Sequence, residues 1–175
     1  VLIKYLTAHS AEVYNDNPRD FLNFVNEGIT ERINSGFVTG LAGHFGTRQK
    51  NGDRKLILSH AGHRQLLVYR KQENAVELIE LPNGTVMGLP GTTASRAKAI
   101  KLQIGDRFYA FTDGIVEASN PKGEEFGTKR VMDAVKSLSA QPIQKTVEAL
   151  YTKVAKFTQV PDQQDDITIL GFELS

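Results

Sequence analysis

Cysteine is absent from the 175-residue sequence. Without cysteine the protein can form no disulfide bond and has no thiolate ligand for a zinc or iron–sulfur site. A chain that needs no disulfide is compatible with a reducing compartment, so we expect a cytoplasmic location.

Long apolar runs and an excess of charge are missing as well. No apolar segment approaches the roughly 20 residues that a membrane-spanning helix requires, and the opening VLIKYLTAHSAEVYN lacks the charged, apolar and small order of a signal peptide. We therefore expect no direct membrane insertion. Lys and Arg number 21 against 20 Asp and Glu, and they are scattered along the chain. Nucleic acid is accordingly not an expected partner.

The apolar content is that of one ordinary domain. Hydrophobic residues make up 40% of the sequence, enough to bury a core at this length. We expect residues 1–175 to form a single domain. The chain opens inside a helix-like apolar pattern without a capping residue before Val1, which predicts a helix cut partway along and hence a fragment.

Hydrophobic periodicity separates helices from strands. A helix is predicted after the cap and first-turn proline Asn17-Pro18, and a long β-hairpin from Phe37 through the turn Asn51-Gly52. We expect the later strands to continue this sheet as a meander. With strands clustered between helices, the expected fold class is α+β, a layered α/β sandwich of antiparallel β-sheets flanked by helices. The predicted helices cover residues 18–34, 127–138 and 143–157, and the predicted strands after the hairpin cover 65–70, 75–81, 97–102, 107–112 and 167–174.

Carboxylates stand at the ends of two predicted strands. Asp113 follows FYAFT, and the pair Asp165-Asp166 precedes ITILGF. Carboxylates at the ends of adjacent strands can project into one concave edge, where a cluster of oxygen ligands suits Mg²⁺ or Mn²⁺. The alternative is an ordinary Asp-Gly turn and a solvated loop, and spacing alone does not decide against it.

The sequence around these carboxylates resembles that of a known family. FYAFTDGIVEASNPKGEEFG resembles the signature of PP2C-like metal-dependent protein serine/threonine phosphatases of the bacterial SpoIIE and RsbU type. LSHAGHRQLLVYR resembles that family's NAGHPPPLL segment, and QDDITIL its closing strand. Weaker matches at FVTGLAGHF, GTVMGLP and PRDFLNFVNEGI extend the resemblance over nearly the whole chain.

The resemblance implies a metal centre and assigns roles within it. Asp113 and Asp165 would be metal ligands, in a site that holds two Mn²⁺ or Mg²⁺ ions around a bridging water. Asp166 would support Asp165 through hydrogen bonds rather than bind metal directly. Thr112 and Gly114 would serve the local geometry, the hydroxyl by hydrogen bonding to a carboxylate or water and the glycine by permitting a sharp turn.

One family motif does not occur in the sequence. The GD-x-x-GHG segment, whose aspartate bridges both metals in the family, would precede the helix that opens this chain. Gly43-His44 is similar to it only superficially, because it lies in a strand pattern without an aspartate two or more places upstream. Two-metal activation of water is then expected to fail, and the 175-residue chain alone is predicted to be inactive.

Two other kinds of site can be considered from the sequence, a zinc site and a phosphate-binding loop. His60 and His63, with His44, could be imagined as a zinc site, but strand geometry would direct His60 and His63 to opposite faces. The glycine-rich loop from Gly84 to Gly91 lacks the lysine and hydroxyl residue of a phosphate-binding loop. A connecting loop is the better interpretation.

The family resemblance also suggests partners. The expected substrate is a phosphoserine or phosphothreonine protein, such as an anti-sigma-factor antagonist, and a sensor or regulatory domain is expected on the N-terminal side. Two alternatives stay open: a non-catalytic module that binds a phosphoprotein, and hydrolysis of a small phosphorylated metabolite. The presence of the missing motif upstream of Val1 would favour an enzyme over the binding module.

Overall fold

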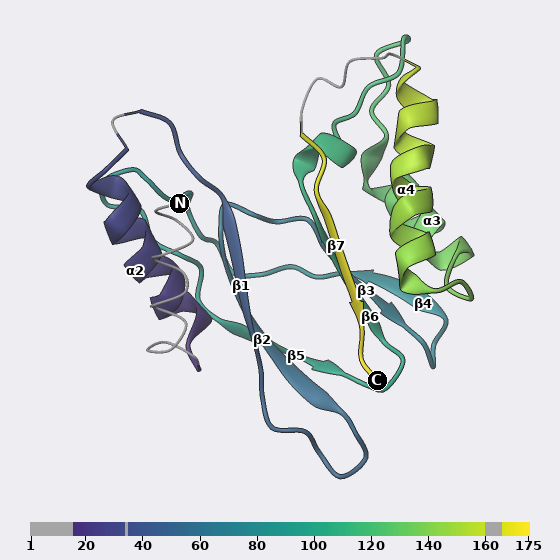
Figure 1. Ribbon diagram of the computed structural model, residues 1–175, viewed down its shortest axis with the longest axis horizontal. Coiled ribbons are helices and arrows are strands. Elements are labelled where there is room, and N and C mark those ends of the chain that lie inside the picture. The colour runs from purple at the N-terminus through teal and green to yellow at the C-terminus, as the bar shows by residue number, and fades with distance from the viewer. Residues whose placement is uncertain (1–15, 34, 160–165) are drawn as a thin grey trace. The chain divides into compact units, whose positions relative to one another are not determined.

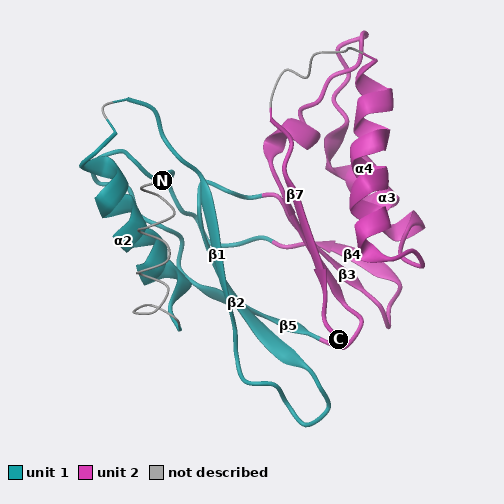
Figure 2. Ribbon diagram, viewed as in Figure 1, with its two compact units in different colours: residues 1–64, 80–102 teal, residues 65–79, 103–175 magenta. Residues whose placement is uncertain are grey.

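The computed structural model describes residues 16–33, 35–159 and 166–175. The chain divides into two compact units, which Figure 2 distinguishes by colour. Unit 1 comprises residues 1–64 and 80–102, and unit 2 comprises residues 65–79 and 103–175. Each unit has its own antiparallel sheet and its own helices (Figure 1). The expected α+β class, antiparallel sheets flanked by helices, is confirmed.

Unit 1 contains a sheet of three strands in the order β1-β2-β5. β1 (Gly40–Phe45) and β2 (Arg54–Ala61) form the predicted hairpin, with Phe45 opposite Leu56. β5 (Lys98–Leu102) pairs with the other edge of β2. The two edges of β2 are thus both occupied, which makes it the central strand of this sheet.

Helix α2 (Pro18–Thr30) packs against β1 and β2. It begins as predicted, since the Asn17 side chain accepts a hydrogen bond from the Asp20 amide and Pro18 occupies the first turn. The apolar side chains at helical spacing bury one face of the helix. The resulting core consists of Leu22, Val25, Ile29, Ala61, Met87 and Ala94.

The loop that precedes β5 is hydrogen-bonded to β2 around His60. The Ser59 hydroxyl donates to the Ser95 carbonyl, and the His60 amide donates to the Ser95 hydroxyl, both at 2.9 Å. A side chain on Gly84 would collide with the His60 carbonyl and the Ser95 amide, so only glycine fits there. The loop that contains Gly84 and Gly91 is therefore structural in unit 1, as expected for a connection.

The buried imidazole of His60 makes unit 1 sensitive to pH. His60 is 1% exposed, its Nε2 donates to the Pro82 carbonyl at 2.9 Å, and its Nδ1 is buried without a partner. Protonation would place a second N–H where no acceptor exists. Burial is the main reason why the pKa of His60 lies below its usual 6.5, with the charge of Arg64 acting in the same direction and the Pro82 hydrogen bond opposing both.

We expect the free energy of unfolding to fall as the pH drops below the unfolded-state pKa of about 6.5. Below this pH the unfolded chain binds a proton at His60 that the folded chain does not bind. The contribution of His60 to the free energy of unfolding is therefore fully present above about pH 6.5. It is lost as the pH falls toward the lower folded-state pKa, by up to about 1.4 kcal/mol per pH unit. Urea unfolding measured between about pH 7.5 and 5, in steps of roughly half a pH unit, gives this slope. His60→Gln should remove it, whereas the half-buried His44→Gln should retain it; equal slopes in both variants would contradict the assignment.

Unit 2 contains a sheet of four strands in the order β4-β3-β6-β7. β3 (Leu66–Arg70) pairs with β4 (Ala75–Leu78) on one edge and with β6 (Arg107–Phe111) on the other. β7 (Ile169–Glu173) completes the sheet beside β6, with Phe111 opposite Ile169. All five residues of β6 are buried. β6 pairs with β3 on one edge and with β7 on the other, so it is an inner strand of this sheet.

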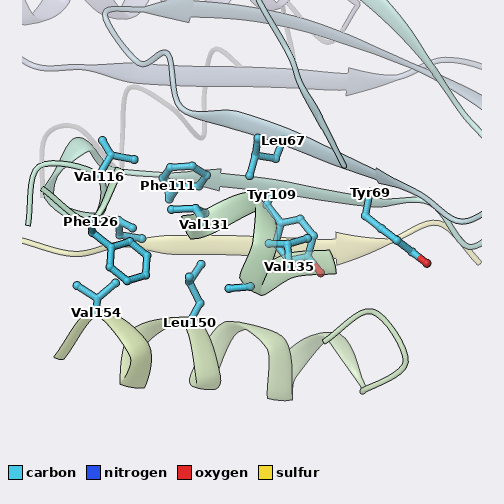
Figure 3. Packing of buried hydrophobic residues seen from close by; sticks show 12 residues of the cluster. Leu67, Tyr69, Tyr109, Phe111, Val116, Phe126, Val131, Val135, Leu150 and Val154 are labelled. Carbon is cyan, nitrogen blue, oxygen red and sulfur yellow. The ribbon is translucent and has the colours of Figure 1, made fainter. Parts of the chain in front are cut away.

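Two helices cover the sheet of unit 2. α3 (Gly127–Ser137) contacts β3 and β4, and α4 (Ile143–Thr158) contacts α3 and β7. Figure 3 shows Leu150 and Val154 pointing from α4 toward the side chains of the strands. The main apolar core of the protein lies here and includes Leu67, Tyr109, Phe111, Ile115, Phe126, Val131, Val135, Leu150 and Val154.

The strand pairing corrects the predicted meander. β3 does not continue the sheet of β1 and β2 but begins the sheet of unit 2. Similarly, β5 and β6 are separated only by a short turn, in which the Asp106 amide donates to the Gln103 carbonyl, yet they belong to different sheets. Periodicity and turn residues are local signals, whereas a strand's partner depends on contacts between distant segments. α2 also ends at Thr30, earlier than the predicted residue 34.

Candidate metal centre

Asp113 lies directly beyond the buried end of β6. The chain leaves the sheet after Phe111 and enters a short 3-10 helix, η1 (Asp113–Ile115), whose Gly114 and Ile115 are buried. Burial of these two residues anchors the turn, while Asp113 itself is exposed. Within the described residues, no hydrogen bond or ion pair engages the Asp113 carboxylate. Its oxygens therefore face solvent and can accept a ligand.

Thr112 joins the end of β6 to the segment that begins β7. Its hydroxyl donates to the Asp166 carbonyl and accepts a hydrogen bond from the Thr168 amide, both at 3.0 Å. Its own amide donates to the Thr168 carbonyl at 3.1 Å. These hydrogen bonds, which we call the Thr112 latch, hold the backbone of Asp166 next to the residue that precedes Asp113.

The contacts of the Thr112 latch differ from the expected ones. The Thr112 hydroxyl is bonded to backbone groups instead of the expected carboxylate or water. Gly114 does not belong to the glycines with positive φ, so the turn at Asp113 does not use the left-handed region. Thr168 was not singled out by the sequence reasoning, although it lies in the QDDITIL segment that was quoted for its aspartates.

Removing the latch hydroxyl should cost a measurable part of the stability of unit 2. Thr112→Val keeps the shape of the side chain but leaves the Thr168 amide without its acceptor, and we expect a loss of about 1 kcal/mol. Thr112→Ser keeps the hydroxyl and should lose less. Urea unfolding of the two variants measures the difference; equal stabilities would mean that the hydroxyl contributes nothing to the latch.

Asp113 is the one expected metal ligand that lies within the described residues. Asp113 offers an exposed carboxylate free of competing cations among the described residues, and such oxygens are preferred by Mg²⁺ and Mn²⁺. Asp166 is exposed and adjacent through the Thr112 latch. Asp165, the second expected ligand, lies outside the described residues. In the described part of the chain, no group of three or more His, Asp or Glu side chains forms a metal site.

The histidines have structural neighbours instead. Nε2 of His60 is bonded to the Pro82 carbonyl, and Nε2 of His44 lies 3.3 Å from an Asp16 carboxylate oxygen. Gly43 and His44 are part of strand β1, as the strand pattern of this segment predicts. In the residues that the structure describes, the imagined zinc site therefore has no support.

Comparisons of sequence and structure indicate the family. Residues 2–175 match the sequence profile of the family described as Stage II sporulation protein E (SpoIIE). Comparison with curated proteins finds no match. None of the described helices is both long and apolar enough to cross a membrane.

Solved structures of phosphatase domains share this fold. The SiaA-PP2C domain of Pseudomonas aeruginosa superposes with a TM-score of 0.72 at 22% identity, over 99% of this chain and 68% of that one. The RsbU and RsbW domains of Rv1364c from Mycobacterium tuberculosis give 0.75 at 20% identity, over 98% and 45%.

A third similar structure is the catalytic domain of the serine/threonine protein phosphatase PstP, in complex with 2 manganese ions, with a TM-score of 0.67 at 12% identity, over 97% and 79%. At these identities the likeness shows the fold, and the match of the sequence profile along almost the entire chain shows the family. The chain therefore belongs to the family described as Stage II sporulation protein E (SpoIIE), and it has the fold of PP2C phosphatase domains.

Proposed function

We propose that this chain is the metal-binding part of a phosphatase that hydrolyses phosphoserine or phosphothreonine on a partner protein. In this proposal Asp113 and Asp165 hold a divalent cation, Mn²⁺ or Mg²⁺. Membership of the SpoIIE family supports the reaction class. The manganese ions in the PstP structure support the choice of cation.

The observation that carries the proposal is the Thr112 latch. The Thr112 hydroxyl donates a hydrogen bond to the Asp166 carbonyl and accepts one from the Thr168 amide, both at 3.0 Å, and so ties this segment to the strand end that presents Asp113. Asp165, the second proposed ligand, directly precedes Asp166 in the sequence. Two carboxylates that share one site repel each other, and a divalent cation between them would offset that repulsion.

The chain's own residues supply position and charge rather than a nucleophile. When bound, the cations would lower the pKa of a water molecule and neutralise charge on the phosphoryl oxygens. The buried Gly114 and Ile115 hold Asp113 at the strand end, and the Thr112 hydroxyl holds the backbone on the other side. Asp166 is proposed to support Asp165 by hydrogen bonding. In this proposal Asp165 binds the cation and Asp166 orients Asp165.

Residues 1–175 contain no Gly-Asp followed by Gly-His-Gly. The proposal therefore assigns the bridging carboxylate of a two-metal site to sequence that is not among these residues, and it predicts no hydrolysis by the 175-residue chain alone. The chain also spans only 68% of the SiaA domain and 45% of the RsbU and RsbW structure. Activity belongs in this proposal to the whole natural polypeptide.

The proposed substrate is a phosphorylated signalling protein, such as an anti-sigma-factor antagonist, in the cytoplasm. The RsbU and RsbW domains that share one structure support a role beside other regulatory domains. A sensor or regulatory domain on the N-terminal side of this one is proposed for the same reason. The expected absence of nucleic acid among the partners follows from the balanced charge, 21 basic against 20 acidic residues.

The test is Mn²⁺-dependent release of phosphate from a phosphoserine protein. The whole natural polypeptide and the 175-residue chain are assayed side by side, with Mn²⁺ and with EDTA. We expect activity only in the whole polypeptide and only with metal. If the whole polypeptide releases no phosphate with any divalent metal, the proposed function fails, and a non-catalytic module that binds phosphoprotein becomes the better account.

A further inference from the structure

A second polar site lies in unit 2, at the other end of strand β6. Arg107 begins this strand and Asp113 lies two residues beyond its end at Phe111, so the two residues are separated by roughly 20 Å of chain. A pocket of about 360 Å³ opens at the Arg107 end. Its walls come from the ends of β3 and β7, the turn before β6 and the link between α3 and α4, and they include Lys71, Gly105, Arg107, Ser139 and Glu173.

Arg107 lines this pocket and has a buried donor without a hydrogen-bond partner. The residue is only 8% exposed. Its Nε donates to Glu173 Oε2 at 2.7 Å, but its Nη1 is buried without any hydrogen-bond partner. A buried guanidinium donor without an acceptor is costly, because the group has lost its hydration and gained nothing in return. An acceptor in the pocket would remove this cost.

Tyr109, the nearest candidate inside the protein, does not provide that acceptor. It is 1% exposed and its Oη is also buried without a partner. Burial raises the pKa of the Tyr109 phenol, and the neighbouring Arg107 and Thr146 lower it by less. The phenol is therefore neutral at pH 7 and supplies no counter-charge, and its approach to Arg107 and Thr146 lacks hydrogen-bond geometry.

Lys71 is held at the rim of the same pocket. Its amide donates to Asp106 Oδ1 at 3.0 Å, and Asp106 is fully buried, so the backbone here is firmly placed. The Lys71 side chain lies against Gly105, which has a φ of +86° and where any side chain would collide with it. No carboxylate among the described residues pairs with the Lys71 ammonium.

The charges of the pocket leave one positive charge unbalanced. Arg107 and Lys71 contribute two positive charges, and Glu173 contributes one negative charge that is already shared with Arg107 Nε. Ser139 adds a half-buried hydroxyl that can donate a hydrogen bond. Charged donors and a hydroxyl on the walls of one pocket form the usual environment of a bound oxyanion.

We infer that this pocket binds a small oxyanion, a phosphate or a carboxylate group, through the Arg107 guanidinium, the Lys71 ammonium and the Ser139 hydroxyl. The site is separate from Asp113 and needs no metal, so it does not rest on the proposed phosphatase activity. The two kinds of anion share the same recognition chemistry, and the experiment distinguishes them.

The test is an NMR titration of the ¹⁵N-labelled 175-residue chain with inorganic phosphate and, separately, with acetate. EDTA is present throughout and chloride keeps the ionic strength constant. We expect saturable shifts of the Lys71, Gly105 and Ser139 amides. Lys71→Ala should weaken binding by about tenfold or more, because it removes one of two charged donors. The exposed control Lys122→Ala should bind as the original chain does.

The outcomes separate clearly. A stronger response to phosphate identifies a phosphate site, and a stronger response to acetate identifies a carboxylate site; either supports the inference. Because Lys71 is exposed, its replacement does not threaten folding, and a Lys71→Ala variant that binds with unchanged affinity overturns the inference. So do shifts confined to the Asp113 end of β6, or shifts that stay linear with anion concentration for both probes, which would mean an adventitious ion only.

Discussion

Asp113→Asn is expected to weaken Mn²⁺ binding by at least about 100-fold. Replacing a residue that merely supports a metal ligand typically costs about 10- to 100-fold in affinity, and we place Asp113 in direct contact with the metal. The substitution removes the formal charge while keeping the size of the side chain. The exposed position of Asp113 and the absence of any ion pair to its carboxylate in the described residues mean that folding should be unaffected.

Calorimetric titration with Mn²⁺ measures this effect in the 175-residue chain, and phosphate release measures it in the whole natural polypeptide. Asp133→Asn is the matched control, since Asp133 is an exposed carboxylate on α3. It should change neither quantity. If Asp113→Asn binds Mn²⁺ as tightly as Asp133→Asn does, Asp113 is not a ligand and the exposed carboxylate is only part of a turn.

Asp106→Ala should destabilise unit 2 by about 3–5 kcal/mol, the range for removing one partner of a buried ion pair. Asp106 is 0% exposed and precedes β6. Its carboxylate accepts hydrogen bonds from Arg70 Nη1 and from the amides of Lys71 and Gln103, each at 3.0 Å. The substitution leaves both amides without acceptors and the Arg70 guanidinium, which is mostly buried, without its inner carboxylate.

Urea unfolding provides the measurement, and Glu77→Ala provides the control. Glu77 also pairs with Arg70, at 2.9 Å, but its side chain is 49% exposed. An exposed ion pair of this kind contributes about 0–1 kcal/mol. Asp106→Ala is therefore expected to lose several times more stability than Glu77→Ala. Similar losses in the two variants would show that the amide hydrogen bonds of Asp106 contribute little to the stability of the turn before β6.

Several elements could be read from the sequence because their signals are local. Asn17 and Pro18 determine where α2 begins, since a cap and a first-turn proline act within a few residues of themselves. β6 was predicted over residues 107–112 and occupies Arg107–Phe111. The position of Asp113 beyond a buried strand followed from the same pattern, although its role as a metal ligand stays a prediction.

Strand partners could not be predicted in the same way. β2 and β3 follow each other closely in the chain, yet β2 pairs with β5 and β3 with β6. Alternating hydrophobicity shows that a segment is extended and which face is apolar, but many partners satisfy the same alternation. The choice among them depends on the packing of segments that are far apart in sequence, such as Phe111 and Ile169.

By itself, then, the sequence predicted most of the described helices and strands and the family, because periodicity, capping and motif spacing are properties of neighbouring residues. The metal-ligand roles of Asp113 and Asp165 stay predictions. Only the tertiary structure decided that Thr112 bonds to the backbone of Asp166 and Thr168. It alone revealed the buried Nη1 of Arg107 as well. Burial and hydrogen-bond partners arise when distant strands and helices pack together, and no short stretch of sequence contains that information.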